Sequence, residues 1–298
     1  MLVTLSQTSK HISLFTDIKQ LTKFGLSISV VFSSVAGYLL GAEVIDYKEL
    51  ILLAVGGYLM VGASNAFNQV IEIKPDALMT RTKTRPLPAG RMSKNTALII
   101  AFVFTILGIA ILYTINPKTA FFGALSIFLY TSVYTPLKTV TPLSVFVGAF
   151  PGAIPFMLGW VAATNHFGIE AGMLFAIQFL WQFPHFWAIG WLLDADYKKA
   201  GFKMLPMGTK DRKLVIQIIL YTLVMILASV YPVLGLTGRL NLSVVAAILI
   251  ALTGCLMLYY AFKLMNEQNT IMARKLMLSS VFYITMIQVI YVADKFIN

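Results

Sequence analysis

Long apolar segments alternate with short polar ones along almost the whole chain of 298 residues. A helix needs about 20 apolar residues to cross the roughly 30 Å hydrocarbon layer of a bilayer. Many segments approach that length, and backbone groups in hydrocarbon must hydrogen-bond within their own segment, so each is predicted to be a helix. The expected spans are 20–41, 50–73, 96–115, 119–137, 142–163, 170–193, 214–236, 241–263 and 276–294.

The composition is that of a chain that lies in lipid. Hydrophobic residues make up 58% of the chain and charged residues 12%, whereas a soluble domain carries about 25% charged residues. Mean hydropathy is +0.81, and a soluble protein of this size could not cover so much apolar surface. The sequence therefore predicts an all-α, polytopic membrane protein of about nine transmembrane helices, forming a single domain over residues 1–298.

The basic residues are distributed unevenly between the loops. The net charge is +11, but most of the 23 Lys and Arg residues fall before the first span, in 74–95, at Lys138, in 194–213 and in 263–275. Excess Lys and Arg mark cytoplasmic loops, so we expect the N-terminus inside and the C-terminus outside. Residues 1–19 and the loops 74–95 and 194–213 are then cytoplasmic. The charge reports topology, and we expect no nucleic-acid partner.

The first group of candidate functional residues lies at the end of the second span. Asn65, Asn68, Gln69 and Glu72 share one stripe of a helix, and such polar groups in a membrane are costly unless they face a cavity or partners. Asn68, Glu72 and Asp76 follow one another at intervals of four residues. Hard oxygen ligands of this kind suit Mg²⁺ that is shared with a phosphate. For Asn65 and Gln69, hydrogen bonding between helices is the favoured alternative.

Basic side chains follow these carboxylates directly. They are Arg81, Lys83 and Arg85, with Lys138 in a short turn further along the chain. Cations beside carboxylates are typical of a site where a metal and basic groups hold a polyanion together. The alternative is a loop that is basic only because it is cytoplasmic, which is the favoured interpretation for Arg91.

The second group lies on the sixth span. A polar stripe on that helix contains Gln178, Gln182, His185 and Asp196, whereas Asp194 falls on the opposite face. His185 precedes Asp196 by about 16 Å of helix, which places it near the middle of the membrane, where an ionisable residue is a functional candidate. A satisfied core histidine is the alternative. The neighbouring aromatic residues, Trp181 among them, line an apolar pocket or face lipid.

Several motifs connect these groups to a known family. The motifs are Asn68-x3-Glu72-x3-Asp76, Arg81-Thr82-x2-Arg85-Pro86-Leu87, Tyr134-Thr135-x2-Lys138, Gly152-Ala153-x-Pro155 with Gly159-Trp160, and Trp181-Gln182-x-Pro184-His185-Phe186 followed by Asp196-Tyr197-x2-Ala200-Gly201-x2-Met204-Leu205-Pro206. Over about residues 20–295 the chain resembles the UbiA-type intramembrane prenyltransferases, and among them the protoheme IX farnesyltransferases (heme O synthases).

The resemblance implies a helical bundle around a central cavity in the bacterial cytoplasmic (inner) membrane. It implies transfer of a farnesyl group from farnesyl diphosphate to a vinyl group of protoheme IX, giving heme O for terminal oxidases, with Mg²⁺ as the cofactor. The implied partners are protoheme IX, farnesyl diphosphate, the lipid bilayer, and a downstream heme-modifying enzyme or terminal oxidase.

The resemblance also implies roles for individual residues. The catalytic residues would be Asn68, Glu72, Asp196 and Lys138. The metal ligands would be Asn68, Glu72, Asp76, Asp194 and Asp196, and the diphosphate would contact Arg81, Lys83, Arg85 and Lys138. The heme would face His185, Gln182 and Trp181, with His185 either an iron ligand or a partner of a propionate.

This sequence departs from the family pattern in the first motif. Glu72 stands in place of the usual Asp, and Pro75 cannot donate a backbone hydrogen bond, so the helix is expected to bend or end there. Two other functions compete with heme farnesylation. One is prenylation of a quinone-precursor ring by an enzyme of the same type, and the other is secondary transport. A transporter should concentrate charge at the midplane, whereas most carboxylates here lie near span ends.

Overall fold

The computed structural model describes residues 13–298, which fold into helices without any strand. The elements are α1 (Leu14–Leu21), α2 (Phe24–Gly41), α3 (Tyr47–Ile71), α4 (Ile73–Leu78), α5 (Lys94–Ile115), α6 (Pro117–Phe128), η1 (Leu129–Tyr134), α7 (Thr135–Leu137), α8 (Ser144–Thr164), α9 (Ile169–Lys199), α10 (Arg212–Val230), η2 (Tyr231–Leu234), α11 (Val244–Glu267) and α12 (Thr270–Ile297). The prediction of an all-α chain is confirmed.

Eight segments within residues 13–298 are long and apolar enough to cross a membrane: α2, α3, α5, α6 with its continuation to Leu137, α8, α10, α11 and α12. The ninth predicted span is α9, whose 31 residues carry several polar side chains and pack against α8, α10 and α12. Large apolar side chains such as Ile106 and Leu227 are exposed on the outside of the bundle. The protein is therefore a multi-span integral membrane protein.

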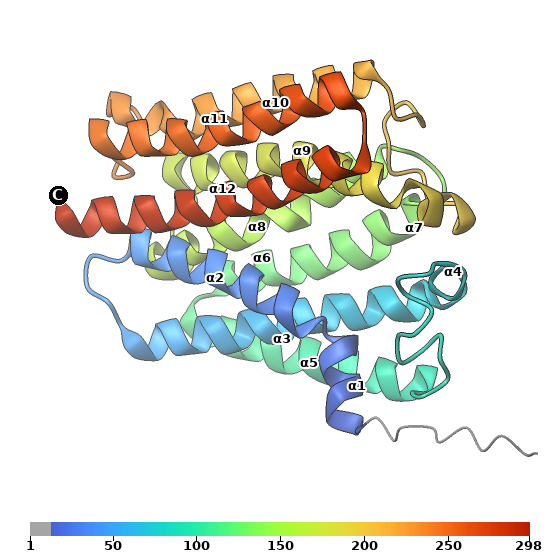
Figure 1. Ribbon diagram of the computed structural model, residues 1–298. Helices are drawn as coiled ribbons and strands as arrows, with labels where there is room; N and C mark the ends of the chain where they lie inside the picture. Colours follow the sequence, from blue (N-terminus) through green and yellow to red (C-terminus); the bar gives the residue numbers. More distant parts are fainter. Residues whose placement is uncertain (1–12) are drawn as a thin grey trace, which may run out of the picture.

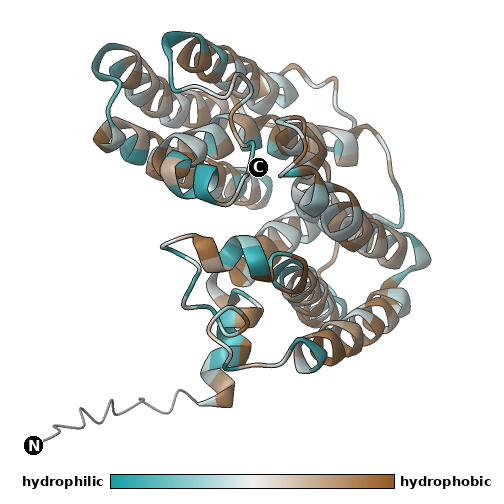
Figure 2. Ribbon diagram, turned by 90° about the vertical axis from the view of Figure 1, so that its right-hand side faces the viewer, coloured by the Kyte–Doolittle hydropathy of each residue, from teal (hydrophilic) through white to brown (hydrophobic). Residues whose placement is uncertain are grey.

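The long helices lie side by side, and the short elements gather at one end of them (Figure 1). This end holds α1, α4, α7 and the loop after α9, while the C-terminus lies at the other end. Figure 2 views the bundle from the end that carries the short elements, where hydrophilic residues collect on loops and helix tips above mostly hydrophobic helices. We call it the polar end.

The centre of the bundle is α8, the most buried of the spans. It packs closely on α2, because a Cβ atom at Gly159 would overlap the backbone of Ser34 and one at Gly37 would overlap the backbone of Phe156. Small residues of this kind allow membrane helices to approach at backbone distance. This contact fixes the position of α2 beside the centre of the bundle.

Two helix breaks shape the polar end. The first separates α3 from α4 at Glu72, and Pro75 falls in the first turn of α4, where its missing N–H leaves no bond unmade. The second is the π-helical segment η1 between α6 and α7, and insertions of this kind are frequent at functional sites. The sequence predicted a break at Pro75, and the structure places it three residues earlier, at Glu72. The sequence treated 119–137 as one regular helix, without the π-helical segment.

Candidate active site

A pocket at the polar end brings most of the predicted anion-binding residues together. We call it the polar pocket, and its lining residues are Lys23, Asn68, Glu72, Asp76, Met79, Arg81, Arg85, Tyr134, Lys138, Tyr197, Phe202 and Met204. They come from the start of α2, the end of α3, the loop around α4, the segment from η1 to the residue after α7, and the end of α9 with its following loop.

The first motif converges on this pocket in spite of the helix break. Asn68 lies on the last turn of α3, and its Nδ2 donates to Thr135 Oγ1 at 3.2 Å. Glu72 caps α3, and Asp76 N–H donates to the Glu72 carbonyl oxygen at 2.8 Å. The backbone therefore continues with a helical turn after α3, and Asp76 remains on the side of the pocket.

Both pocket carboxylates pair with cations. Lys138 Nζ lies 2.8 Å from Glu72 Oε1, and Arg85 Nη1 lies 2.7 Å from Asp76 Oδ2. Lys23 Nζ reaches Asn68 Oδ1 at 3.5 Å. Lys138 directly follows α7, so the path of the π-helical segment before it sets where this ammonium group lies.

The pocket alters the proton affinity of its two lysines. Burial, with help from the nearby charges of Arg85 and Lys138, lowers the pKa of Lys23 to about 7. Burial alone would also lower the pKa of Lys138, but the Glu72 carboxylate outweighs it and the pKa of Lys138 is raised. Lys138 is therefore a fixed positive charge at neutral pH.

The balance of charge in the pocket favours an anion. Its four basic residues are Lys23, Arg81, Arg85 and Lys138, against the two carboxylates of Glu72 and Asp76. A cluster of cations with a few carboxylates suits a polyanion bound together with a divalent metal. The charges and their arrangement thus favour binding of a diphosphate at the polar end of the bundle.

The donor set also fits Mg²⁺. Within residues 13–298 no three His, Cys, Asp or Glu side chains form a metal-binding group, but Mg²⁺ commonly takes one or two carboxylates and completes its shell with substrate phosphates and water. Asp76 is fully buried, and its Oδ1 has no hydrogen-bond partner. Such an unsatisfied buried oxygen is costly, and a cation between Asn68, Glu72 and Asp76 would satisfy it.

The other predicted ligands lie outside the lining of the pocket. Asp196 is on its rim, where Oδ2 accepts the Arg81 backbone N–H at 3.3 Å. Asp194 pairs with Lys198 at 2.9 Å and lies 3.6 Å from Lys210. Lys83 is exposed.

The residues predicted to face heme divide between two faces of α9. Trp181 Nε1 donates to the Ser280 carbonyl oxygen at 2.6 Å, and His185 Nδ1 lies 2.8 Å from Ser280 Oγ, so both face α12. Their rings stack with centroids 4.5 Å apart. Gln182 instead donates to the Ala149 carbonyl oxygen of α8 at 2.8 Å and is buried. The single polar stripe predicted for this helix thus serves two different neighbours.

Several pocket residues were not predicted. Lys23 adopts a left-handed conformation with φ 47°, which is uncommon for a residue with a side chain and often marks a functional site. Tyr197, Phe202 and Met204 reach the pocket because the chain after α9 folds back, with Lys203 N–H bonded to the Lys138 carbonyl oxygen at 2.7 Å. Tyr197 and Met204 belong to the family motif that begins at Asp196 but had no predicted role, and Phe202 lies between them in the charged loop 194–213.

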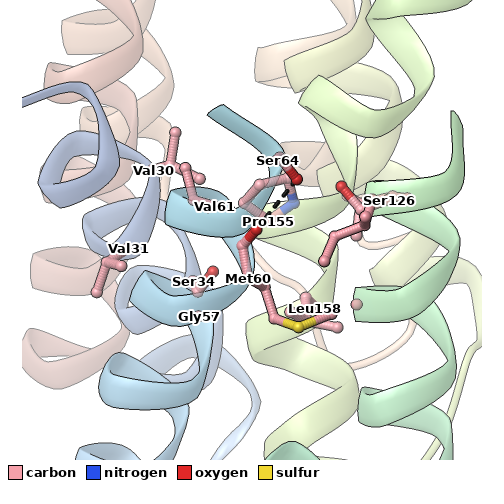
Figure 3. A pocket seen from close by; sticks show the side chains of 13 residues that line it. Val30, Val31, Ser34, Gly57, Met60, Val61, Ser64, Ser126, Pro155 and Leu158 are labelled. Carbon is pink, nitrogen blue, oxygen red and sulfur yellow. Dashed lines mark hydrogen bonds between the residues drawn. The ribbon is translucent and has the colours of Figure 1, made fainter. Parts of the chain in front are cut away.

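A second pocket lies deeper between the helices, and we call it the apolar pocket (Figure 3). It is lined by Val30, Val31 and Ser34 of α2, by Gly57, Met60, Val61 and Ser64 of α3, by Gly123, Ser126 and Ile127 of α6, and by Ile154, Pro155 and Leu158 of α8. The hydroxyl groups of Ser64 and Ser126 donate to helix carbonyl oxygens, which leaves a largely hydrocarbon wall.

Comparison with known proteins identifies relatives over almost the full chain. Residues 30–287 match the UbiA prenyltransferase family. The protoheme IX farnesyltransferase of Christiangramia forsetii is 64% identical over 297 residues, with 99% of each chain covered. The protoheme IX farnesyltransferase of Flavobacterium psychrophilum is 64% identical over 289 residues, with 96% of each chain covered.

Solved structures share the arrangement of helices. A structure described as digeranylgeranylglyceryl phosphate synthase in membranes matches with a TM-score of 0.78 at 18% identity, covering 95% of this chain and 99% of that one. A UbiA homolog from Archaeoglobus fulgidus bound to DMAPP and Mg²⁺ matches with a TM-score of 0.67 at 14% identity, covering 92% and 99%. At these identities the likeness shows the fold, which is the UbiA-like helical bundle.

Proposed function

The chain belongs to the UbiA prenyltransferase family, and from this membership we propose that it transfers a farnesyl group from farnesyl diphosphate to a vinyl group of protoheme IX, giving heme O. The observation that carries the proposal is the polar pocket, where two carboxylates, an amide and four basic residues meet at the ends of helices that also enclose an apolar pocket. A polar head and an apolar tail are the two parts of an isoprenoid diphosphate.

The basic residues of the pocket would bind the diphosphate. Lys23, Arg85 and Lys138 are already held within the pocket by their contacts with Asn68, Asp76 and Glu72. Arg81 would contact the outer phosphate oxygens from the loop. Charges that are held in place before the reaction stabilise the negative charge that develops as the allylic C–O bond breaks. Lys83 is exposed and lies outside the pocket lining, so it would act on the diphosphate only as a more distant positive charge.

Asn68, Glu72 and Asp76 would hold Mg²⁺ in this pocket, and Asp196 would reach it from the rim. Asp194, the outermost carboxylate, would add negative charge at a greater distance. When bound, Mg²⁺ would neutralise charge on the leaving diphosphate. In support, the relative from Archaeoglobus fulgidus was solved with DMAPP and Mg²⁺. Glu72 and Asp76 would exchange their present cationic partners in part for the metal.

The apolar surroundings would protect the farnesyl cation from early capture by water. The vinyl group of protoheme IX would attack the farnesyl cation after diphosphate has left, forming a C–C bond and leaving a cation on the vinyl carbon next to the porphyrin ring. Water would add to this second cation and lose a proton to solvent, which supplies the hydroxyl group of the product. The residues proposed to contact the heme are Trp181 and His185, which lie next to α12, and Gln182, which lies against α8. His185 Nδ1 is engaged by Ser280 Oγ, so Nε2 is the atom for iron or a propionate.

The same proposal fixes the setting of the reaction. The whole chain 1–298 would act as one domain in the bacterial cytoplasmic (inner) membrane, with the N-terminus and the loops 74–95 and 194–213 in the cytoplasm. Heme O would pass to a terminal oxidase or a heme-modifying enzyme.

Two alternative functions remain to be compared with this one. Prenylation of a quinone precursor would need the same diphosphate site and differs only in the acceptor. Transport is disfavoured, because Glu72 and Asp76 lie at helix ends rather than at the midplane.

The test is conversion of protoheme IX by membranes that contain the full chain, supplied with farnesyl diphosphate and Mg²⁺. Pigment extracted afterwards should contain a heme whose mass has increased by one farnesyl group and one hydroxyl group. Membranes without the chain serve as the control. Prenylation of an added quinone precursor with unchanged heme would reject the proposed acceptor.

A further inference from the structure

The apolar pocket continues the polar pocket along the same helices. On α3, Asn68 lines the polar pocket, and Ser64 and Met60 line the apolar one at successive turns below it. On the segment from α6 to α7, Lys138 belongs to the polar pocket and Ile127 to the apolar one. The two pockets therefore follow one another along these elements, and an isoprenoid whose diphosphate lies in the polar pocket would take this path towards the middle of the bundle.

Met60 closes this path on the side of α5 and α6. Its side chain is 5% exposed and lies against two glycines, because a Cβ atom at Gly108 would be 2.7 Å from Met60 Sδ and one at Gly123 would be 3.3 Å from Met60 Cε. Figure 3 shows its sulfur beside Leu158, at the end of the pocket away from Ser64. Without the long Met60 side chain, the path would extend into the space beside the two glycines.

The distances along α3 match an isoprenoid of one length. Asn68 and Met60 are separated by eight residues, or about 12 Å of helix at roughly 1.5 Å per residue. An extended farnesyl chain spans about 13 Å, at the roughly 1.2 Å per bond of an extended chain. One isoprene unit more or less changes this by about 5 Å, which is about one turn of helix.

We propose that Met60 determines the length of the isoprenoid chain that the enzyme accepts, by closing the apolar pocket one farnesyl length from the diphosphate site. This inference rests on the proposed function, because it assumes that the diphosphate lies in the polar pocket. Geranylgeranyl diphosphate would meet Met60, and geranyl diphosphate would leave the last turn of the pocket unfilled.

The experiment is a competition among geranyl, farnesyl and geranylgeranyl diphosphates in one reaction with protoheme IX and membranes that contain the full chain. The ratio of the heme products is measured by mass, so the amount of active protein cancels. In Met60→Ala we expect the ratio of geranylgeranyl to farnesyl product to rise at least about tenfold, because pocket contacts of this size change selectivity by that order.

A second variant should move the ratio in the opposite direction. In Gly123→Ala the new Cβ would lie 2.9 Å from Leu112 Cδ1 and 3.3 Å from Met60 Cε, so it would push the methionine into the pocket and favour geranyl diphosphate. Met257→Ala removes another buried methionine, on α11, and should leave the ratio unchanged. If Met60→Ala does not accumulate in the membrane, the smaller change Met60→Val supplies the same comparison.

The outcomes separate this inference from the proposed function. Heme farnesylation by the wild-type chain with unchanged ratios in the active Met60 variants would overturn the role of Met60 and leave the proposed function standing. Absence of any isoprenoid product on heme from the wild-type chain would reject the proposed function itself. An equal shift in Met257→Ala would also overturn the inference, because the effect would then be a general consequence of loosened packing.

Discussion

Glu72 Oε1 accepts a hydrogen bond from Lys138 Nζ at 2.8 Å, which joins the end of α3 to the residue that follows α7 across the polar pocket. Both side chains are at most 10% exposed, so each charge depends on the other for compensation. The pair has two proposed roles. It holds the two helix ends together, and it positions Glu72 to bind the metal and Lys138 to bind the diphosphate.

These roles can be separated by substitution. Glu72→Gln should lower farnesyl transfer at least about 100-fold, the scale found when a group that stabilises developing charge is removed. It should also destabilise the fold by about 3 kcal/mol or more, because Lys138 loses its buried partner. The paired variant Glu72→Leu with Lys138→Met should regain thermal stability in detergent while remaining inactive. Recovery of activity along with stability would mean that the pair is only structural.

Metal dependence gives a test of the donor set. We expect EDTA to abolish heme farnesylation in membranes and added Mg²⁺ to restore it. In Asp76→Asn, the carboxylate whose Oδ1 now lacks a partner becomes a neutral amide. Half-maximal activity should then require at least about tenfold more Mg²⁺, because even the loss of a hydrogen-bond partner of a metal ligand lowers metal affinity by about 10- to 100-fold. Asp211→Asn, which alters a helix cap outside the pocket, is the control. An unchanged Mg²⁺ titration in Asp76→Asn would remove Asp76 from the site.

How far the sequence predicts this structure depends on what controls each feature. The nine predicted spans correspond to α2, α3, α5, α6 with its continuation to Leu137, α8, α9, α10, α11 and α12. Lipid requires long apolar helices, and this requirement acts within each segment. Asn65 and Gln69 were expected to bond between helices, and they do, donating to carbonyl oxygens of Thr22, Gln20 and Leu21 at the end of α1. Local pattern was sufficient for these features.

The site was harder to predict, because it depends on contacts between distant segments. Spacing alone placed Asn68 and Glu72 together, but the π-helical segment that sets the position of Lys138 leaves no pattern in the sequence. Lys23 joins the pocket through a left-handed backbone turn. The stripe on α9 divides between α8 and α12, and helical periodicity cannot say which neighbour each side chain meets.

Arg91 shows the same limit, since the sequence favoured a basic residue without a specific role. Its guanidinium group bonds Asp17 Oδ1 at 2.9 Å, Gln20 Oε1 at 2.9 Å and the Thr84 carbonyl oxygen at 3.0 Å, so it ties α1 to the loop that carries Arg81 and Arg85.

We therefore expect Arg91→Gln to make this loop more accessible to protease and to lower activity several-fold, since a truncated ion pair with one buried partner costs about 1–3 kcal/mol. Limited proteolysis of inside-out membrane vesicles measures the accessibility of the loop. Lys94→Gln, an exposed cation nearby, should change neither. Protection of the loop equal to that of the wild type would show that α1 does not hold it.

The role of His185 can be tested by measuring KM separately for protoheme IX and for farnesyl diphosphate. His185→Ala removes the ring that stacks on Trp181 and bonds Ser280, at a distance from the polar pocket. We expect KM for protoheme IX to rise about tenfold or more while KM for farnesyl diphosphate stays near its original value, since only heme binding loses a contact. His166→Ala, at an exposed loop, is the matched control. An equal rise of both KM values would make His185 a packing residue.

The two aspartates at the end of α9 provide the sharpest comparison, because they lie two residues apart on one helix and differ in surroundings. Asp196 accepts the Arg81 N–H on the rim of the polar pocket, and the adjacent Tyr197 lines it. Asp194 is engaged by Lys198 and Lys210. If Asp196 completes the metal diphosphate site, Asp196→Asn should reduce turnover at least about 100-fold, with normal amounts of protein in the membrane.

Asp194→Asn should then retain most activity, because it loses only ion pairs with exposed lysines, which contribute little. Both variants keep the shape of the side chain and the helix, so a difference between them reports position alone. The measurement is initial rate of heme farnesylation at saturating Mg²⁺, normalised to the amount of chain in the membrane. Equal losses of activity in the two variants would mean that the end of α9 contributes only negative charge, without a specific metal ligand. A larger loss in Asp194→Asn would assign the metal-binding role to Asp194, and the loop after α9 would then have to rearrange when substrate binds.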